Sequence, residues 1–267
     1  MEWLQQLDVG KFLLFTLVLT RVSGLLMTAP IYGTADIPTQ VRALFTLAIA
    51  VLVFPSQWQV PVPDPGNLAE YLILVGSELV IGAGLGFGIA ILFSGIDLAG
   101  QLIDQVSGLM IAEVFDPTQG NNTSIISRLL FLVTLSIFVA IGGHRIVMAG
   151  LLDTFRTIPP GSAAMPASLG ETLVTLIGQS FVLGIRAAAP VVASMLLANV
   201  VLGLIARALP QLNILVIGFG INALLALGVL GISLGAAVWV FQDQVEPAVA
   251  AVLDGLKSAR YAVGSTQ

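Results

Sequence analysis

The longest stretch of the chain without a charge runs from Ala208 to Gln242, and it restricts the folds open to this sequence. Its 35 residues include no Asp, Glu, Lys, Arg or His. As one helix the stretch would measure about 50 Å, against about 30 Å for the hydrocarbon core of a bilayer. We therefore expect it to bend or to open into a hairpin, at Gly218, Gly220 or Asn222.

The composition of the whole chain leads to the same class of protein. Of its 267 residues, 57% are hydrophobic and 9% are charged, and the mean hydropathy is +1.01. A soluble domain carries roughly a quarter charged residues. One soluble core cannot bury this much apolar surface, so the sequence predicts a polytopic membrane protein with membrane lipid as one partner.

The apolar runs of the sequence are uneven in length. Val41–Phe54 is short for a membrane span, whereas Leu68 to about Gly108 is much longer than a bilayer requires. The polar tail after Asp243 is expected to end in a short surface helix. These lengths predict an all-α fold of long, kinked helical hairpins packed in a larger assembly. The remaining runs are Phe12–Ile31, Ile125–Gly142, Thr172–Ala206 and Ala208–Gln242.

Several classes of function are excluded by what the sequence lacks. There is no cysteine, so disulfides, thiolate metal sites and thiol nucleophiles are impossible. The ten Lys and Arg residues form no patch, so nucleic acid is not an expected partner. Ser233 lies in a G-x-S-x-G match, but a nucleophile elbow needs a strand-to-helix turn and this match lies in an apolar helix. We expect no enzyme activity, no metal and no cofactor.

The most conspicuous irregular segment between two apolar runs is GLMIAEVFDPTQGNNTSIISR, from Gly108 to Arg128. Its Asp-Pro and Gly-Asn-Asn sequences disfavour a helix. The approach to this break is apolar, and irregular backbone at membrane depth persists only where it is packed inside protein or lines an aqueous cavity. The loop is therefore a candidate pore constriction; the alternative is an ordinary turn packed on its own helices. The residues assigned to the constriction are Leu109, Met110, Ile111, Val114, Phe115, Asp116 and Pro117.

Three charged residues, Arg21, Glu78 and Arg186, lie within apolar runs. A charge at the bilayer centre costs about 2.5 to 3.5 kcal/mol even on the lenient insertion scale, so each needs a partner or water. We expect Glu78 to pair with Arg21 or Arg186, either as a lock between helices or as part of a proton or ion relay. Gly82 and Gly86, four residues apart near Glu78, have the spacing that allows helix backbones to approach closely.

Asp97, Gln101 and Asp104 share one helix face that runs into the Gly108–Arg128 segment, because they are spaced four and three residues apart. One interpretation is the wetted wall of a conduit. The other is a solvated helix end beyond the membrane.

Four segments of the chain together resemble one family over almost its whole length. They are APIYGTADIPTQVR (Ala29–Arg42), GLMIAEVFDP with the following Asn and Ser residues (Gly108–Ser124), GGHRIVMAGLLDTFRTIPPG (Gly142–Gly161) and RALPQLNILVIGFGI (Arg207–Ile221). In this order and at this spacing they are similar to the FliR family of flagellar type III export-gate proteins, whose injectisome relatives are called SctT.

The resemblance implies a fold, partners and a location. It implies one integral membrane domain over residues 1–267, with a FliP-like part over about 1–160 and a FliQ-like part over about 170–267. FliP and FliQ homologues would be its partners in a helical hetero-oligomeric gate of the bacterial inner (cytoplasmic) membrane, within the flagellar basal body. FlhB-like and FlhA-like proteins and unfolded export substrates would also be partners.

The same resemblance assigns a role to the central loop. In the family the loop corresponding to residues 108–123 forms a plug across the closed pore. Two positions depart from the family pattern: Glu113 places a charge near the apolar plug, and Gly220 stands where relatives usually have proline. The glycine at position 220 would give a softer bend.

A small-solute secondary transporter is the alternative function from a different class. Broken helices and charges inside the membrane are typical of such transporters. An inverted repeat is also typical of them, and the third and sixth apolar runs do not carry matching charges. A flagellar export-gate subunit is therefore the leading hypothesis.

Overall fold

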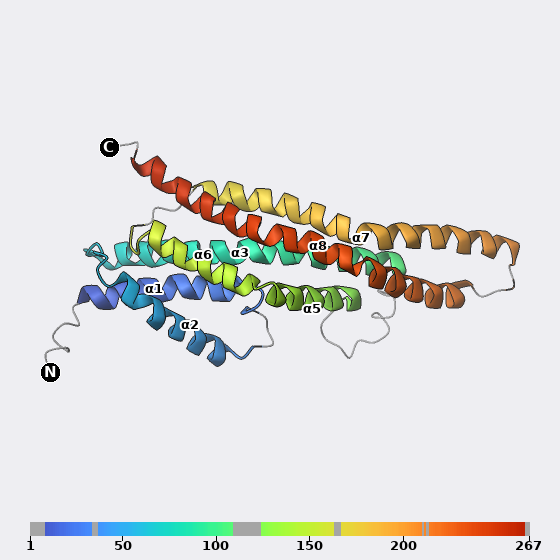
Figure 1. The fold of residues 1–267 in the computed structure, drawn as a ribbon, viewed down its shortest axis with the longest axis horizontal. Helices are drawn as coiled ribbons and strands as arrows, with labels where there is room; N and C mark the ends of the chain where they lie inside the picture. Colours follow the sequence, from blue (N-terminus) through green and yellow to red (C-terminus); the bar gives the residue numbers. More distant parts are fainter. Residues whose placement is uncertain are drawn as a thin grey trace. The chain divides into compact units, whose positions relative to one another are not determined.

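The computed structural model describes residues 9–33, 37–108, 124–162, 167–209, 211 and 214–264, and these residues form helices and turns without any strand. This confirms the predicted all-α class. Figure 1 shows the helices in chain order. They are α1 (Val9–Thr28), α2 (Thr39–Val53), the 3-10 helix η2 (Phe54–Gln57), α3 (Leu68–Ser107), α5 (Ile125–Ala140), α6 (Gly143–Thr157), α7 (Ala167–Ala208) and α8 (Ile214–Gly264).

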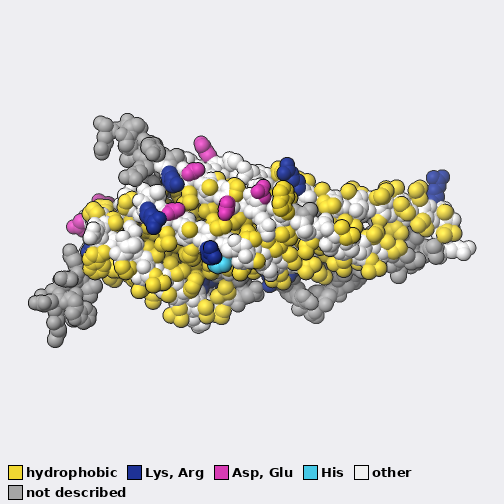
Figure 2. All heavy atoms as spheres, in the orientation of Figure 1, with side chains coloured by type: hydrophobic (Ala, Val, Ile, Leu, Met, Phe, Trp, Pro, Cys, Tyr) yellow, Lys and Arg dark blue, Asp and Glu magenta, His cyan; other side chains and the backbone are white. Residues whose placement is uncertain are grey.

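The described helices are long and apolar enough for a polytopic membrane protein. Four of them could each cross a membrane: α1, α2 together with η2, α3, and α7 from Ser168. The number rises to six if two bent helix pairs are counted as one span each. Figure 2 shows hydrophobic side chains over much of the visible surface, which such helices would present to lipid or to other proteins.

The chain divides into two compact units that do not follow its order. The first unit comprises residues 1–91, 142–176 and 245–267, and the second comprises 92–141 and 177–244. The long helices α3, α7 and α8 each contribute to both units. Each unit therefore draws residues from both of the parts expected from the sequence, about 1–160 and about 170–267.

In the first unit α1 packs on α3 with their backbones in contact. A Cβ atom built on Gly82 would overlap the carbonyl oxygen of Arg21, and one on Gly86 would overlap the hydroxyl of Thr28. On the other side of the contact, a Cβ on Gly24 would lie closer to the backbone of α3 than real Cβ atoms approach. Small residues at these positions are what allow the close crossing.

The turn after α1 packs against α2. The ring of Tyr32 stacks on that of Phe45 with centroids 5.5 Å apart, and burial raises the pKa of the Tyr32 phenol. Backbone N–H groups of Tyr32 and Gly33 donate to the carbonyl of Ala29 at 3.1 and 2.8 Å. This compact turn lies within the Ala29–Arg42 segment that carried the family resemblance.

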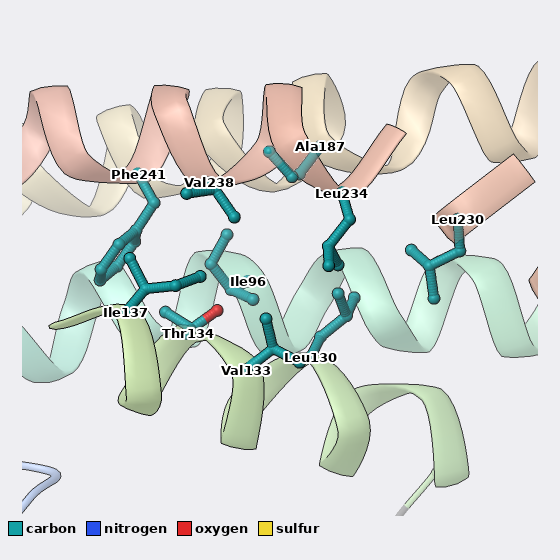
Figure 3. Close-up of a pocket in the computed structure, with 11 residues that line it drawn as sticks. Ile96, Leu130, Val133, Thr134, Ile137, Ala187, Leu230, Leu234, Val238 and Phe241 are labelled. Atoms are coloured by element: carbon teal, nitrogen blue, oxygen red, sulfur yellow. The ribbon is translucent and has the colours of Figure 1, made fainter. Parts of the chain in front are cut away.

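In the second unit the far half of α3 packs with α5, α7 and α8 around aromatic rings. Phe93 lies edge-on to Phe131, Phe138 and Phe241 at centroid distances of 5.4 to 5.7 Å. Next to Phe241 is an apolar cavity of about 20 Å³, in which Thr134 is the polar lining side chain (Figure 3). The remaining lining residues are Ile96, Leu130, Val133, Ile137, Ala187, Leu230, Leu234, Ala237 and Val238.

The C-terminal part of the chain differs from the expectation in two respects. The polar tail after Asp243 does not form a separate surface helix, because α8 continues through it to Gly264. The bend in the long charge-free run is not at Gly218–Asn222, since α8 bends by 48° between Gly235 and Ala237. The hairpin opens earlier than those residues, between the end of α7 at Ala208 and the start of α8 at Ile214.

Candidate functional site

The first unit encloses a charge pair between α1 and α3. The Nε atom of Arg21 donates to Oε2 of Glu78 at 2.5 Å, and neither side chain is exposed. An isolated charge at such a depth would be very costly, and the pair is kept only because each charge compensates the other.

Residues of α6 and the turn after it complete the surroundings of this pair. Arg21 Nη1 donates to the carbonyl of Ile158 at 2.9 Å, and its guanidinium carbon lies 4.4 Å from the centroid of the Phe155 ring. The Gly161 N–H donates to Glu78 Oε1 at 2.9 Å, and a longer contact of 3.4 Å joins Arg21 to the Thr154 hydroxyl. The cluster thus ties α1, α3, α6 and one turn together, as an ionic lock would.

Gly161 is suited to its position by its backbone conformation. Its φ is +80°, which a residue with a side chain rarely adopts, and a Cβ there would lie 3.1 Å from Pro63. The turn Pro159–Gly161 therefore places the Gly161 N–H against Glu78 with little steric cost.

Arg186 lies elsewhere and in different surroundings. Its side chain is on the exposed face of α7 in the second unit, whereas Arg21 and Glu78 are fully buried. The carboxylate of Glu78 is engaged by Arg21 and the Gly161 N–H. Arg186 is therefore not part of the buried cluster.

The two ends of the central loop are held together in the second unit. Asp104, at 2% exposure near the end of α3, accepts a hydrogen bond from the Ile126 N–H in the first turn of α5 at 3.1 Å. Ser124 caps the same helix by accepting from the Ser127 N–H at 3.1 Å. A carboxylate at a helix N-terminus satisfies a free N–H and is favoured by the helix dipole. The two ends of the loop, at residues 108 and 124, therefore lie close together.

The other two members of the polar face on α3 remain accessible. Gln101 is exposed and donates to the half-exposed Asp97 carboxylate at 2.8 Å. The Ser127 hydroxyl donates to the backbone carbonyl of Asp97 at 3.1 Å, which adds a second contact between α3 and α5. Asp104 is thus occupied in joining helices, and Asp97 and Gln101 form the part of this face that water can reach.

All of the residues assigned to the pore constriction lie outside the described residues. The last described position before them is Gly108, whose φ of +75° ends α3 in a left-handed conformation. The assigned residues are Leu109, Met110, Ile111, Val114, Phe115, Asp116 and Pro117.

Comparison with known proteins places these features in a family. Residues 12–248 match the model of the family described as bacterial export proteins, family 1. The flagellar biosynthetic protein FliR of Escherichia coli K12 is 31% identical over 237 residues, which cover 89% of this chain and 86% of that protein. FliR of Aquifex aeolicus is 31% identical over 83% of this chain and 86% of its own length, and FliR of Bacillus subtilis is 29% identical over 79% and 82%.

The chain belongs to the FliR family of bacterial export proteins.

The structure gives physical reasons for two of the segments that carry the FliR resemblance. The segment Gly142–Gly161 supplies Thr154, Phe155, the Ile158 carbonyl and the Gly161 N–H to the buried cluster. The segment Gly108–Ser124 begins with the glycine that ends α3 and finishes with the serine that caps α5. Sequence reasoning did not assign these roles, although the Pro-Pro-Gly turn and a serine before an apolar run were visible signals.

Proposed function

We propose that this chain is a non-enzymatic subunit of the flagellar protein export gate in the bacterial inner membrane. With FliP and FliQ homologues it would form the channel that passes unfolded flagellar proteins out of the cytoplasm. FlhB-like and FlhA-like proteins would complete the apparatus and other components would supply the energy. Membership of the FliR family and the apolar helices support this proposal.

The single observation that carries the proposal is the closure of the loop base by Asp104 and Ile126. A segment anchored at both ends can occupy a pore and swing aside without unfolding the helices that hold it. Both partners of this contact, Asp104 and Ile126, lie on the helices that flank the loop, so the seal and its frame would be separate parts. In the closed gate the apolar residues of the loop would exclude water and ions from the pore.

Polar substitutions in the loop test this role. In cells that express the complete gate, Met110→Ser, Ile111→Ser and Phe115→Ser should each raise ion leakage across the membrane, because a polar lining wets the constriction. The matched control is Ile125→Ser, an exposed apolar residue in the first turn of α5 beside the loop. If the three loop variants leak no more than the control, the loop is not the seal.

The partners are tested by co-expression. The chain, as the only tagged component, would be purified together with FliP and FliQ homologues from the same source and weighed by native mass spectrometry. A defined complex containing one copy of this chain is expected. Recovery of the chain alone, or as a symmetric homo-oligomer, would contradict the proposal and favour the small-solute transporter.

A further inference from the structure

The far ends of α7 and α8 in the second unit are joined to each other as an arm, which comprises residues 191–208 and 214–234. Asn222 Nδ2 donates to Asn199 Oδ1 at 2.9 Å, and a Cβ on Gly218 would lie 3.6 Å from a methyl group of Leu202. These two contacts fix the register of the helices along the arm. We therefore expect the arm to keep its shape when it moves.

Pro190 interrupts the backbone hydrogen bonds of α7 at the base of the arm. It lies inside the helix and its side chain is exposed. Proline has no N–H to donate to the carbonyl of Arg186, four residues earlier, and its ring crowds the preceding turn. The Ser194 hydroxyl donates to the Pro190 carbonyl at 2.7 Å, and such bonds to the helix backbone tend to bend helices. At this position α7 therefore bends more easily than a regular helix does.

Glycines weaken α8 at the same level. Pro190 and Gly231 are each nine residues from the asparagine pair, so they lie level with each other in the hairpin. One turn further on, α8 bends by 48° between Gly235 and Ala237. A Cβ on Gly231 or Gly235 would meet nothing within 4 Å, so packing within the chain does not require glycine at these positions. The backbone freedom of glycine makes a bend easy there.

The cavity beside Phe241 lies at this level and touches both helices of the hairpin. Ala187 lines it from α7, and Leu234 and Val238 line it from α8 (Figure 3). The rest of the wall comes from α3 and α5, and Thr134 is the polar side chain in it. A volume of about 20 Å³ is large enough for one water molecule, but a buried water needs several polar partners, which this wall does not offer. The cavity is therefore apolar free volume between helices.

Free volume beside a helix bend gives side chains room to move. Protein interiors are close-packed, so a change in the angle of a helix normally drives its side chains into their neighbours. Leu234 and Val238, which flank the bend at Gly235, can instead shift within the cavity that they line. A proline in α7, a glycine bend in α8 and the free volume beside them thus coincide at one level of the second unit.

We propose that the arm pivots as one body on the rest of the second unit, about a hinge formed by Pro190 of α7 and Gly235 of α8. Leu234 and Val238 fill the cavity at one end of this motion and leave it open at the other. Hinges of this kind consist of a few residues that absorb the change in φ and ψ, while the helices on either side keep their shape. The proposal does not rest on the export role or on the Gly108–Arg128 loop.

Distances between pairs of spin labels test the hinge, and the chain has no native cysteine to replace. Leu204→Cys on the arm and Leu132→Cys on α5 place labels at exposed positions on opposite sides of the hinge. Double electron–electron resonance on the full chain in detergent micelles gives the distribution of the distance between them. One control pair, Leu204→Cys/Leu227→Cys, lies within the arm. The other, Leu132→Cys/Phe181→Cys, lies outside it, and the distribution across the hinge should be broader than that of either control.

Variants that stiffen the hinge should narrow the distribution across it. Pro190→Ala restores a backbone N–H to α7, and Gly235→Ala removes the freedom of glycine at a position where the Cβ has open space. Val133→Ile adds a methylene group at the cavity wall. Each variant should bring the width of the distribution toward that of the controls. Gly203→Ala makes the same chemical change within the arm, where the Cβ also meets nothing within 4 Å, and should leave the width unchanged.

Several results would overturn the proposal. A distribution across the hinge that is as narrow as both controls would mean that the arm does not pivot. An arm pair as broad as the pair across the hinge would mean that the arm is not one body. If Gly203→Ala narrowed the distribution as much as Gly235→Ala, or if neither Pro190→Ala nor Gly235→Ala narrowed it, the hinge would not lie at these residues. Both hinge substitutions raise helix propensity, so the variants should fold.

Discussion

Arg21 and Glu78 lie 2.5 Å apart with both side chains fully buried, although 57 residues separate them in the sequence. The pair joins α1 to α3 at the place where their backbones come into contact. A buried ion pair is not a strong source of stability in itself, but it strongly penalises the loss of either partner.

Removing one partner of this pair should therefore strongly lower the free energy of unfolding. Glu78→Gln keeps the shape of the side chain but leaves Arg21 as an uncompensated buried charge, at an expected cost of about 3 to 5 kcal/mol. The double variant Arg21→Met/Glu78→Met should be less destabilised than Glu78→Gln, because no charge is left buried. Titration of the purified chain with SDS measures the free energy of unfolding of both variants.

The exposed pair of Arg156 and Asp153 is a control for the buried pair. Their atoms are 3.5 Å apart and the side chains are 79% and 50% exposed. Arg156→Ala should change the free energy of unfolding by less than about 1 kcal/mol. If Arg156→Ala and Glu78→Gln lowered the free energy of unfolding equally, burial would not determine how much the loss of an ion pair destabilises the chain.

The close crossing of α1 and α3 predicts a difference between two glycines of the same helix. Gly82→Ala should destabilise the chain by about 1 to 3 kcal/mol, because its Cβ would overlap the Arg21 carbonyl and push the helices apart. Gly76→Ala meets nothing within 4 Å and should be neutral or stabilising by up to about 1 kcal/mol. The same SDS titration distinguishes the two, and equal behaviour would argue against a close crossing.

Asp104 should control the order of the first turn of α5. Asp104→Ala removes the acceptor for the buried Ile126 N–H, at an expected cost of about 1 to 3 kcal/mol. Hydrogen exchange of the amides of residues 125–128 should become faster. Gln101→Ala, on the same helix but exposed, should leave that exchange unchanged, and protection retained in Asp104→Ala would show that the carboxylate does not hold the turn.

The small cavity beside Phe241 predicts opposite effects of adding and removing carbon atoms. Val133→Ile adds one methylene group at the cavity wall and should stabilise the second unit by up to about 1 kcal/mol. Ile96→Ala, at a buried residue of the same wall, should lower the free energy of unfolding by about 2 to 5 kcal/mol. Thermal unfolding followed by the tryptophan signal measures both, and a loss of stability in Val133→Ile would mean that the cavity cannot admit the group.

The sequence was informative where its turn signals are strong. The run from Leu68 to about Gly108 became α3, Leu68–Ser107, since a proline-rich linker precedes it and a left-handed glycine ends it. The end of α8 was missed for the opposite reason. Asp243, Glu246, Asp254 and Lys257 made the tail look separate, but polar residues on one face are compatible with a continuing helix.

The arrangement of the candidate site was only partly accessible from the sequence. Arg21, Glu78 and Arg186 were all identified as charges in apolar runs, because that property is local. The choice of Arg21 over Arg186 as the partner of Glu78 depends on packing between distant segments. A single sequence taken by itself carries no information about that packing. The role of Asp104 was missed for the same reason, since its partner Ile126 follows a long loop.

The interleaved order of the units has a consequence for synthesis of the chain. In the first unit Gly88 of α3 lies against the side chain of Val252 of α8, roughly 160 residues later. At roughly 5 to 20 residues per second, a ribosome needs roughly 10 to 30 s to make the residues between them. During that interval the contact between Gly88 and Val252 cannot form, so the packing of the first unit is completed only after α8 has been made.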